Sequence, residues 1–488
     1  MIPVLKFNGW VIMSVCNWVK EEMPKLDTGD KRLDKRAKLV LQAVANKPNT
    51  SFTQQFESAG ELKACYRLFD SDLITSETIL EPHFAKTVER IQACKVVVIA
   101  SDSTSLNYTT RTSNSDSGYI SSNNAQGFLM HTSLATTLDR QPLGVLSAKF
   151  WARSKEKPAK KLHRDYLPIE DKESFKWVES YAIANQVASL CPATQIINVA
   201  DREADIIELW EDAVDACKSK NTAYLLVRCN HNRAVIPTKE NNNFKLFEYA
   251  KASPVIGECE FELKDRATHS VIRIVKQNIH ASSVCICPAT RSGVERREVL
   301  LNIVFMEEIA PPEGVEPIQW YLLTTLPIEN NDDVQKIIQA YLARWDIEVL
   351  FRTFKTGCKV EERSLRTANR LYPMFSLFLV VAWRINSLTR ISRIQPDLPC
   401  TIVFSDEEWK AAYVAVHKSS PSKVLTIREM LILVARLGGY LNRNSDPEPG
   451  AKVIWRGLEY LRIFMDALSV VQILYDTQDD ISVKKSCG

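Results

Sequence analysis

Two apolar runs, each ending in an aspartate, constrain the fold of this chain more than any other feature. The first is Lys95-Val-Val-Val-Ile-Ala-Ser-Asp102, whose β-branched residues predict a buried strand. The second is Gln195-Ile-Ile-Asn-Val-Ala-Asp201, which predicts another strand and leads into a helical pattern. Both place a carboxylate at the carboxyl edge of a strand. In open α/β sheets ligands gather outside those edges, so the two aspartates are expected to converge there.

Each aspartate also has a purely structural explanation. An Asp after a strand is often a turn residue or the N-cap of a helix. Asp201 has two acidic neighbours, Glu203 and Asp205, that compete with it for any functional role. The sequence alone leaves both explanations open.

A polar stripe on a predicted helix forms the third informative segment. At about 100° per residue, one narrow face gathers the side chains of Tyr341, Arg344, Glu348, Arg352 and Lys355. A tyrosine, a carboxylate and several cations could hold a metal ion together with phosphates. Glu and Lys or Arg at this spacing also form ordinary salt-bridged, solvated faces, which is the alternative.

These segments, in this order, resemble the DDE transposases of bacterial insertion sequences, in particular the IS-four group that includes the Tn-five transposase. The family signature Y-x2-R-x3-E-x6-K is met by Tyr341, Arg344, Glu348 and Lys355. The motif D-R-E-A-D is met from Asp201 to Asp205, and the first-aspartate motif from Asp102 to Leu106. A family tryptophan on a strand upstream of the signature is met by Trp320. The resemblance covers most of the chain.

The resemblance implies a metal-dependent active site. Asp102, Asp201 and Glu348 would be the catalytic residues and the ligands of two Mg²⁺ ions, for which Mn²⁺ can substitute. Carboxylates suit these hard cations, and a pair of ions about 3.5–4 Å apart can activate the attacking oxygen and stabilise the leaving one in phosphodiester chemistry.

The resemblance also implies a set of DNA contacts around that site. Tyr341, Arg344 and Lys355 would bind phosphates near the scissile bond. Trp320 would stack on a base flipped out of the duplex while a hairpin forms, although a tryptophan on a strand is as often a core residue. Arg228 and Arg233 match basic positions that hold the hairpin, with Asn230 where the family has a lysine.

Positive charge is concentrated in two segments instead of being spread along the whole chain. The net charge of +3 and the pI near 8.1 do not by themselves mark a nucleic-acid binder. Two segments are strongly basic, namely 31–38 and 149–164. The first contains Lys31, Arg32, Lys35 and Arg36. Either segment could neutralise DNA phosphates, or could serve only solubility.

The length of 488 residues exceeds a single typical core and predicts several domains. We expect a possible upstream extension at 1–12 and a helical DNA-end-binding domain at 13–90. A ribonuclease-H-like catalytic domain of α/β class, a mixed sheet flanked by helices, follows at 91–395. It carries a β insertion at about 226–326, because the separation of Asp201 and Glu348 exceeds what a minimal fold of this kind needs. A helical dimerisation domain is expected at 396–488.

Other features favour a cytoplasmic protein with no membrane segment. The twelve cysteines lack paired C-x2-C spacing, which argues against a disulfide framework or a structural zinc site and suggests a reducing compartment. No apolar run approaches the roughly 20 residues that span a bilayer.

The sequence therefore predicts a homodimeric cut-and-paste transposase that binds transposon ends, cleaves them through a hairpin and joins the 3′-hydroxyls to target DNA. Two alternatives stay open. One is a catalytically idle DNA-binding regulator, which the intact Asp102, Asp201 and Glu348 set argues against. The other is a ribonuclease-H-like nuclease without strand transfer, which Trp320 and the 341–355 signature argue against.

Overall fold

The chain begins with a group of helices. The computed structural model describes residues 18–110, 116–121, 124–154, 167–237, 245–264, 271–287 and 297–486. The first helices are α1 (Trp18–Glu22), α2 (Lys31–Asn46), α3 (Phe52–Gln55), α4 (Ala59–Phe69) and α5 (Ser76–Gln92). Side chains of Asp30 and Ser58 cap α2 and α4, and Ser51 forms a capping box at α3. The expected extension at 1–12 lies outside the described residues.

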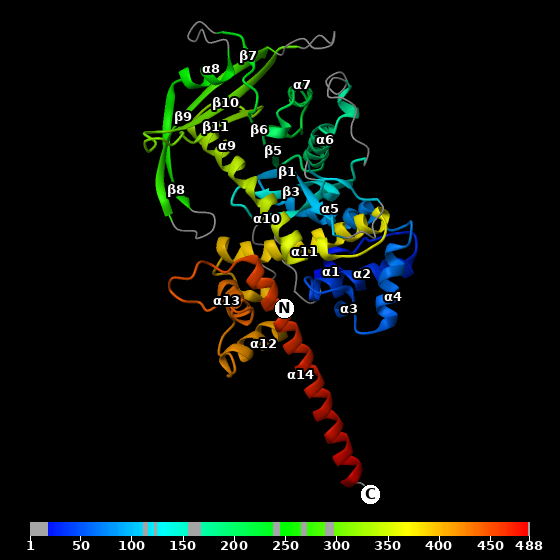
Figure 1. The fold of residues 1–488 in the computed structure, drawn as a ribbon. Coiled ribbons are helices and arrows are strands. Elements are labelled where there is room, and N and C mark those ends of the chain that lie inside the picture. The colour runs from blue at the N-terminus through cyan, green and yellow to red at the C-terminus, as the bar shows by residue number, and fades with distance from the viewer. Residues whose placement is uncertain are drawn as a thin grey trace.

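The middle of the chain forms a core built on a mixed sheet. Its central strands are β1 (Val96–Asn107), β3 (Gln126–Thr137), β4 (Pro142–Trp151), β5 (Gln195–Ala200) and β6 (Tyr224–Arg228). They lie in the order β4-β3-β1-β5-β6, with β1, β5 and β6 parallel and β3 antiparallel to both β1 and β4 (Figure 1). A two-residue strand, β2 (Gly118–Tyr119), pairs with β3. The predicted α/β, ribonuclease-H-like arrangement is confirmed.

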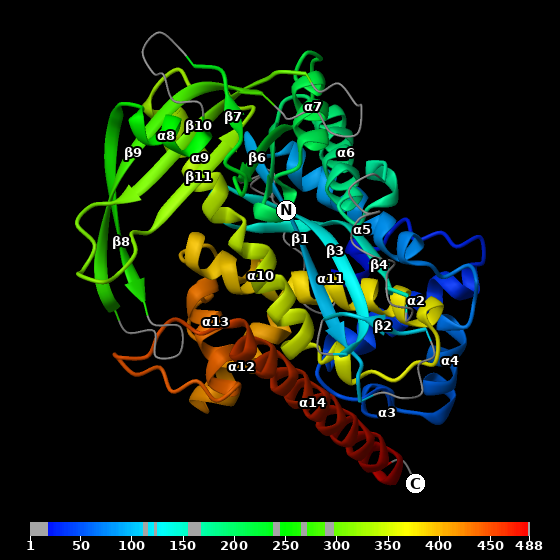
Figure 2. The ribbon, with the colours of Figure 1, turned by 45° about the horizontal axis from the view of Figure 1, so that its top comes forward.

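Helices cover both faces of this sheet. One face packs against α5, α6 (Phe175–Leu190) and α7 (Ile207–Ala216), through residues such as Val97 and Ile99 of β1. The opposite face packs against α9 (Asn331–Ala343), α10 (Trp345–Arg352) and α11 (Ala368–Ile394), through residues such as Val98 and Ala100. Successive residues of a strand point to opposite faces, so Asp102 falls on the side of α9 to α11. Figure 2 shows β1 and β3 as neighbours beside α10.

The position of Asp102 within its strand differs from the sequence prediction. The strand was expected to end at this aspartate, but β1 continues to Asn107. The continuation is stabilised by β3, whose register with β1 extends to Asn107 opposite Gly127. The parallel pairing with β5 stops earlier, at Ala100 opposite Val199. Asp102 therefore lies just past the end of the parallel pair, although it is inside the longer strand.

The β insertion extends the core sheet instead of forming a separate one. It contains β7 (Ala234–Val235), α8 (Leu246–Ala252), β8 (Val255–Lys264), β9 (Val271–Cys287), β10 (Val299–Glu308) and β11 (Gln319–Thr324). Strand β11 pairs with β6, so all eleven described strands belong to one sheet. The predicted start near 226 falls inside core strand β6.

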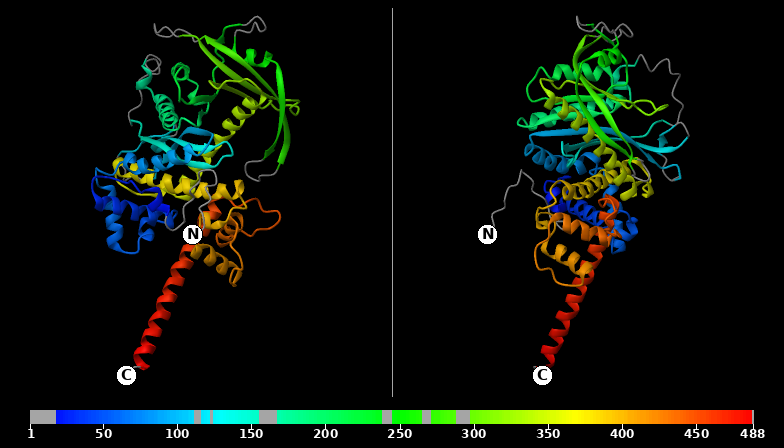
Figure 3. Two further views of the ribbon diagram at one scale, coloured as in Figure 1. Left: turned by 180° about the vertical axis from the view of Figure 1, so that it is seen from behind. Right: turned by 90° about the vertical axis from the view of Figure 1, so that its left-hand side faces the viewer.

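The last part of the chain is helical, as predicted. It consists of α12 (Asp406–His417), α13 (Ile427–Leu437) and α14 (Ala451–Ser486), which extends away from the rest of the protein (Figure 3). Helices α13 and α14 cross at very close range. A Cβ on Gly438 would lie 2.1 Å from the carbonyl oxygen of Val453, and one on Gly457 would lie 1.7 Å from that of Val434. Only glycine fits at these two positions.

Helix α11 corrects the expectation that no segment could span a membrane. Ala368–Ile394 is long and apolar enough to do so by length and composition. Yet 89% of its most apolar window is buried inside the protein. It is the central core helix on its side of the sheet, contacting helices from both ends of the chain. Its apolarity is explained by this burial.

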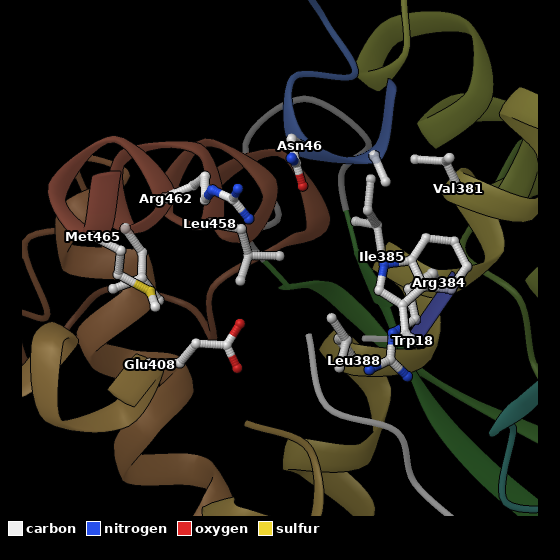
Figure 4. Close-up of a pocket in the computed structure, with 12 residues that line it drawn as sticks. Trp18, Asn46, Val381, Arg384, Ile385, Leu388, Glu408, Leu458, Arg462 and Met465 are labelled. Carbon is white, nitrogen blue, oxygen red and sulfur yellow. The ribbon is translucent and has the colours of Figure 1, made fainter. Parts of the chain in front are cut away.

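A small cavity lies where the three parts of the chain meet. Trp18 and Asn46 from the first helices, Arg384 of α11, Glu408 of α12 and Arg462 of α14 line it (Figure 4). The first described helices and the helices near the carboxyl end thus meet on one core helix. This contact includes charged groups as well as apolar ones.

A buried ionic cluster joins α1 to α5 and, through His83, to strand β4. Glu22 is fully buried and contacts Nδ1 of His83 at 2.5 Å and Nη2 of Arg90 at 2.9 Å. The Nε2 atom of His83 accepts a hydrogen bond from the backbone N–H of Val145, so Nδ1 carries the proton and the imidazole is neutral. Burial alone would raise the pKa of Glu22, but His83 and Arg90 outweigh it and lower the pKa to about 2.

We predict that Glu22→Gln lowers the free energy of unfolding by about 3–5 kcal/mol, because it leaves a buried guanidinium without its counter-charge. Urea denaturation at pH 7 measures this change. Glu89→Gln is the control, on the helix α5 that carries Arg90, since Glu89 forms an exposed pair with Lys86 and its loss should cost at most about 1 kcal/mol. Equal effects of the two substitutions would contradict the assignment.

Candidate active site

Two neighbouring parallel strands bring Asp102 and Asp201 to one face of the sheet. Asp201 follows β5 directly and lies on the same face as Ile197 and Val199, which pack toward α9. Its side chain also accepts a hydrogen bond from the backbone N–H of Glu203 at 2.9 Å, as the N-cap of a short 3₁₀ turn. The capping explanation is therefore correct for Asp201 and leaves its other oxygen free for further contacts.

The polar stripe of the sequence is carried by three consecutive helical pieces. Helix α9 ends at Ala343, α10 begins at Trp345, and residues Thr353–Gly357 form a π-helical turn. The prediction that these side chains form a single narrow stripe is therefore wrong in detail. The break at Arg344 and the extra residue of the π turn rotate the later side chains away from the positions that a straight α-helix would give them. Tyr341 is buried, Glu348 is half-buried and Arg352 is exposed.

Arg344 joins two of the predicted catalytic acids. Its Nη1 atom lies 2.9 Å from Oδ2 of Asp102, and its Nη2 atom lies 2.6 Å from Oε1 of Glu348. The guanidinium is only 12% exposed and Asp102 only 17%. Residues 242 positions apart in the sequence are thus linked by one cation. The structure brings Asp102, Arg344 and Glu348 into direct contact.

The electrostatics place Asp201 next to this group. Burial, helped by the negative charge of Asp201, raises the pKa of Asp102 to about 6 against the opposing effect of Arg344. Burial opposes the charge of Arg344, but the surrounding anions outweigh it, and the pKa of its guanidinium is raised. The site therefore holds more negative charge than its own cation offsets.

The other acids of the D-R-E-A-D motif have different roles. Asp205 is buried and accepts hydrogen bonds from Trp210 Nε1 at 3.0 Å and from the backbone N–H groups of Asn230 and His231. It also pairs with Arg233 at 2.5 Å. Glu203 is exposed and contacts Lys176. Asp205 thus holds the loop after β6, and Asp201 is the acid that faces Asp102.

An aromatic and a cation lie beside the carboxylates. The ring of Trp320, on β11, meets that of Tyr341 edge-on with centroids 5.4 Å apart. The guanidinium carbon of Arg228, on β6, lies 6.0 Å from the centroid of Trp320. Trp320 is half-buried and packs against the core only in part. The arrangement leaves part of the indole ring accessible to a base.

The remaining predicted DNA contacts are distributed less closely. Lys355 lies half-buried in the π-helical turn, where burial lowers its pKa despite the charge of Glu361. Arg233 is committed to Asp205, and its side chain is 13% exposed. Among the described residues, the side chains of Lys31, Arg32, Lys35 and Arg36 have no carboxylate partner within 4 Å, and the first three are exposed on α2.

The second basic segment is only partly described. Lys149 pairs with Glu179 and Arg153 pairs with Glu173, so these two cations are offset by acids. The other predicted cations, at 155–164, lie outside the described residues. The segment 149–164 stays a prediction as a DNA contact.

The acids offer the right donors for Mg²⁺ or Mn²⁺, which prefer carboxylate oxygens. Within the described ranges, however, no three His, Cys, Asp or Glu side chains are close enough together to form a ready ligand cluster. Arg344 explains why the three predicted acids do not form such a cluster, because its guanidinium lies between Asp102 and Glu348. The residues fit the ions in chemistry and charge, provided that Arg344 moves.

One contact of the site could not be read from the family signature. Asp346 lies between Arg344 and Glu348 and pairs with Arg140 of the turn between β3 and β4. The only signal in the sequence is an aspartate on a helix position that is otherwise suited to apolar residues. Its partner lies 206 positions away, so sequence spacing gives no indication of it.

Comparison with known protein families identifies both ends of the chain. Residues 15–74 match the family model described as Transposase DNA-binding. Residues 380–477 match the model described as Transposase Tn5 dimerisation domain. The first match covers α1 to α4, and the second covers the later part of α11, all of α12 and α13, and most of α14. DNA and a second copy of the chain are therefore its partners.

We predict that Asp205→Asn and Asp201→Asn have opposite signatures. Asp205→Asn removes the charge that a nearly buried Arg233 requires, so the free energy of unfolding should fall by about 3–5 kcal/mol. Asp201→Asn should leave stability unchanged or raise it slightly, since it relieves repulsion with Asp102. Urea unfolding of both proteins tests this, and a larger loss for Asp201→Asn would contradict the division of roles.

Proposed function

This chain is a Tn5-like transposase, and we propose that it cuts and joins DNA with Asp102, Asp201 and Glu348 as its catalytic residues. The observation that carries the proposal is the contact of Arg344 with both Asp102 and Glu348, on a face that Asp201 shares. Two acids from β1 and α10 that share one largely buried cation, with a third acid beside them, are not typical of a solvated salt-bridged face. Asp102, Asp201 and Glu348 together carry more negative charge than Arg344 offsets, and this excess favours the binding of a cation.

Asp102, Asp201 and Glu348 would hold two Mg²⁺ or Mn²⁺ ions. When bound, such ions lower the pKa of the attacking oxygen and neutralise charge on the transferring phosphate. We assign Asp201 to both ions, since it lies next to Asp102 and keeps an oxygen free beyond its capping bond. Asp102 and Glu348 would complete one site each.

Arg344 would change partners as the substrate binds. In the protein alone its guanidinium bonds to Asp102 and Glu348, and a fork of this kind fits a phosphate equally well. A DNA phosphate near the scissile bond would draw Arg344 away from the two acids. The acids would then be free to bind metal at the moment when the substrate is in place.

Trp320, Tyr341 and Arg228 would receive the DNA strand beside the carboxylates. The indole ring is partly accessible, and a flipped base could stack on it for roughly 1–3 kcal/mol. Such a base would relieve the sharp bend of a hairpin intermediate. Arg228, over the indole and next to Tyr341, would bind a nearby phosphate, and Lys355 would bind another.

Binding of DNA ends and dimerisation would serve this chemistry. The exposed cations of α2, on the DNA-binding part, would contact phosphates of the terminal inverted repeat. The dimer would hold two ends, each cut by the active site of the partner. We expect these events in the bacterial cytoplasm, where the chromosome lies.

We predict that linear DNA carrying the inverted repeats that flank the coding sequence is nicked and then converted to a hairpin, with Mg²⁺ or Mn²⁺. Asp102→Ala, Asp201→Ala and Glu348→Ala should each abolish both products, since each removes a metal ligand. Trp320→Ala should still nick the DNA but form about 10-fold less hairpin than the wild type, because one stacked base is lost. A denaturing gel of end-labelled DNA measures both steps.

Arg202→Gln serves as the control for charge near the site, because Arg202 follows Asp201 but is exposed and should affect neither product strongly. Binding of the repeats without any cleavage would favour an idle regulator. Cleavage without a hairpin or joined product would favour a simple nuclease. Activity that survives Asp201→Ala would contradict the catalytic assignment itself.

A further inference from the structure

Asp346 is a buried acid that touches none of the groups assigned above. It lies on α10, two residues before Glu348, and is 5% exposed. Two residues on an α-helix are about 200° apart, so the two carboxylates point to opposite sides of α10. Glu348 faces Arg344, and Asp346 faces the turn between β3 and β4.

The carboxylate of Asp346 is fully engaged at that turn. Its Oδ1 atom accepts hydrogen bonds from Nε of Arg140 at 3.0 Å and from Nη2 at 2.6 Å. Its Oδ2 atom accepts one from Oγ1 of Thr136 at 3.2 Å. Thr136 is completely buried, and the Arg140 side chain is 32% exposed. Both oxygens therefore have defined partners on one hairpin.

The turn that carries Arg140 is itself held in place. Arg140 has a left-handed backbone with φ of 68° and donates its N–H to the carbonyl of Thr137 at 2.9 Å. Its own carbonyl accepts a hydrogen bond from Nε of Arg390, on α11, at 3.0 Å. The next residue, Gln141, bonds to Ser387 on the same helix. Arg140 is thus a fixed donor.

The hairpin is in continuous register with the strand that carries Asp102. Thr136 lies opposite Val98, and Thr132 lies opposite Asp102, within one unbroken antiparallel ladder between β3 and β1. Any displacement of β3 relative to α10 would therefore move Asp102 relative to Glu348. The contact of Asp346 with Arg140 and Thr136 is a direct polar connection between that strand pair and α10.

We infer that the Arg140–Asp346 ion pair is a positioning device that sets the distance between Asp102 and Glu348. The inference rests on the proposed function of those two acids. A buried ion pair contributes little net stability compared with apolar packing, but its fork geometry fixes direction and distance. Arg344 braces α10 on one side, and Arg140 braces it on the other. When Arg344 turns to the DNA, the Arg140–Asp346 pair still ties α10 to the β3–β4 hairpin by polar contacts, in addition to its apolar packing.

The test compares Arg140→Gln, Asp346→Asn and the double variant in the full-length protein. Binding of the inverted-repeat DNA should be unchanged, while the rate of nicking falls about 10- to 100-fold, the loss expected from a misplacement of about 1 Å. The Mn²⁺ concentration that gives half-maximal nicking should rise, because two ligands are no longer held at a fixed distance. The double variant should lose no more than the worse single variant.

Arg140→Lys should recover part of the rate, since it keeps the charge but loses the fork. The matched control is Arg273→Gln, which breaks the similarly buried Arg273–Glu308 pair in the β insertion. It should lower the free energy of unfolding without changing the half-maximal Mn²⁺ concentration. Arg140→Gln, at a partly exposed side chain, carries the test if Asp346→Asn does not fold.

The inference is overturned if Arg140→Gln lowers stability but leaves the Mn²⁺ requirement as in the wild type. It is equally overturned if the losses of the single variants multiply in the double variant, because the two residues would then act independently. Failure of the proposed function has a different signature, namely nicking that persists in Asp201→Ala. Failure of the inference and failure of the proposed function are therefore distinguished, because different variants report them.

Discussion

The guanidinium of Arg344 is the interaction on which the candidate site depends. It joins Asp102 on β1 to Glu348 on α10, through bonds of 2.9 and 2.6 Å. Without a cation between them, Asp102, Glu348 and the neighbouring Asp201 would repel one another in a largely buried place, where screening by water is weak. One positive charge makes this arrangement possible, and the negative charge that it does not offset is what the proposed metal ions would neutralise.

The sheet explains why these groups meet at all. Asp102 and Asp201 follow adjacent parallel strands and point to the same face, so the topology brings them together. Glu348 arrives on α10, which is braced by Arg344 toward Asp102 and by Asp346 toward the β3–β4 turn. Because β11 pairs with β6, the inserted strands place Trp320 beside Tyr341 on the same side. The proposed catalytic acids and the proposed DNA contacts thus share one scaffold.

The sequence correctly predicts those features that depend on the local pattern of residues. The strands predicted for the apolar runs before Asp102 and Asp201 were confirmed, because such runs are decided by neighbours in the chain. Three features escaped prediction from the sequence. The extension of β1 to Asn107 depends on pairing with β3, the π turn depends on packing of the following segment, and Asp346 depends on a residue 206 positions away. Each is set by long-range contacts.

The most direct test of the account is Mn²⁺ binding by calorimetry in the absence of DNA. We predict that Asp201→Ala loses binding, while Arg344→Gln binds Mn²⁺ more tightly than the wild type, because the competing cation is removed from Asp102 and Glu348. Weaker binding by Arg344→Gln, or wild-type binding by Asp201→Ala, would show that these acids do not form the metal site.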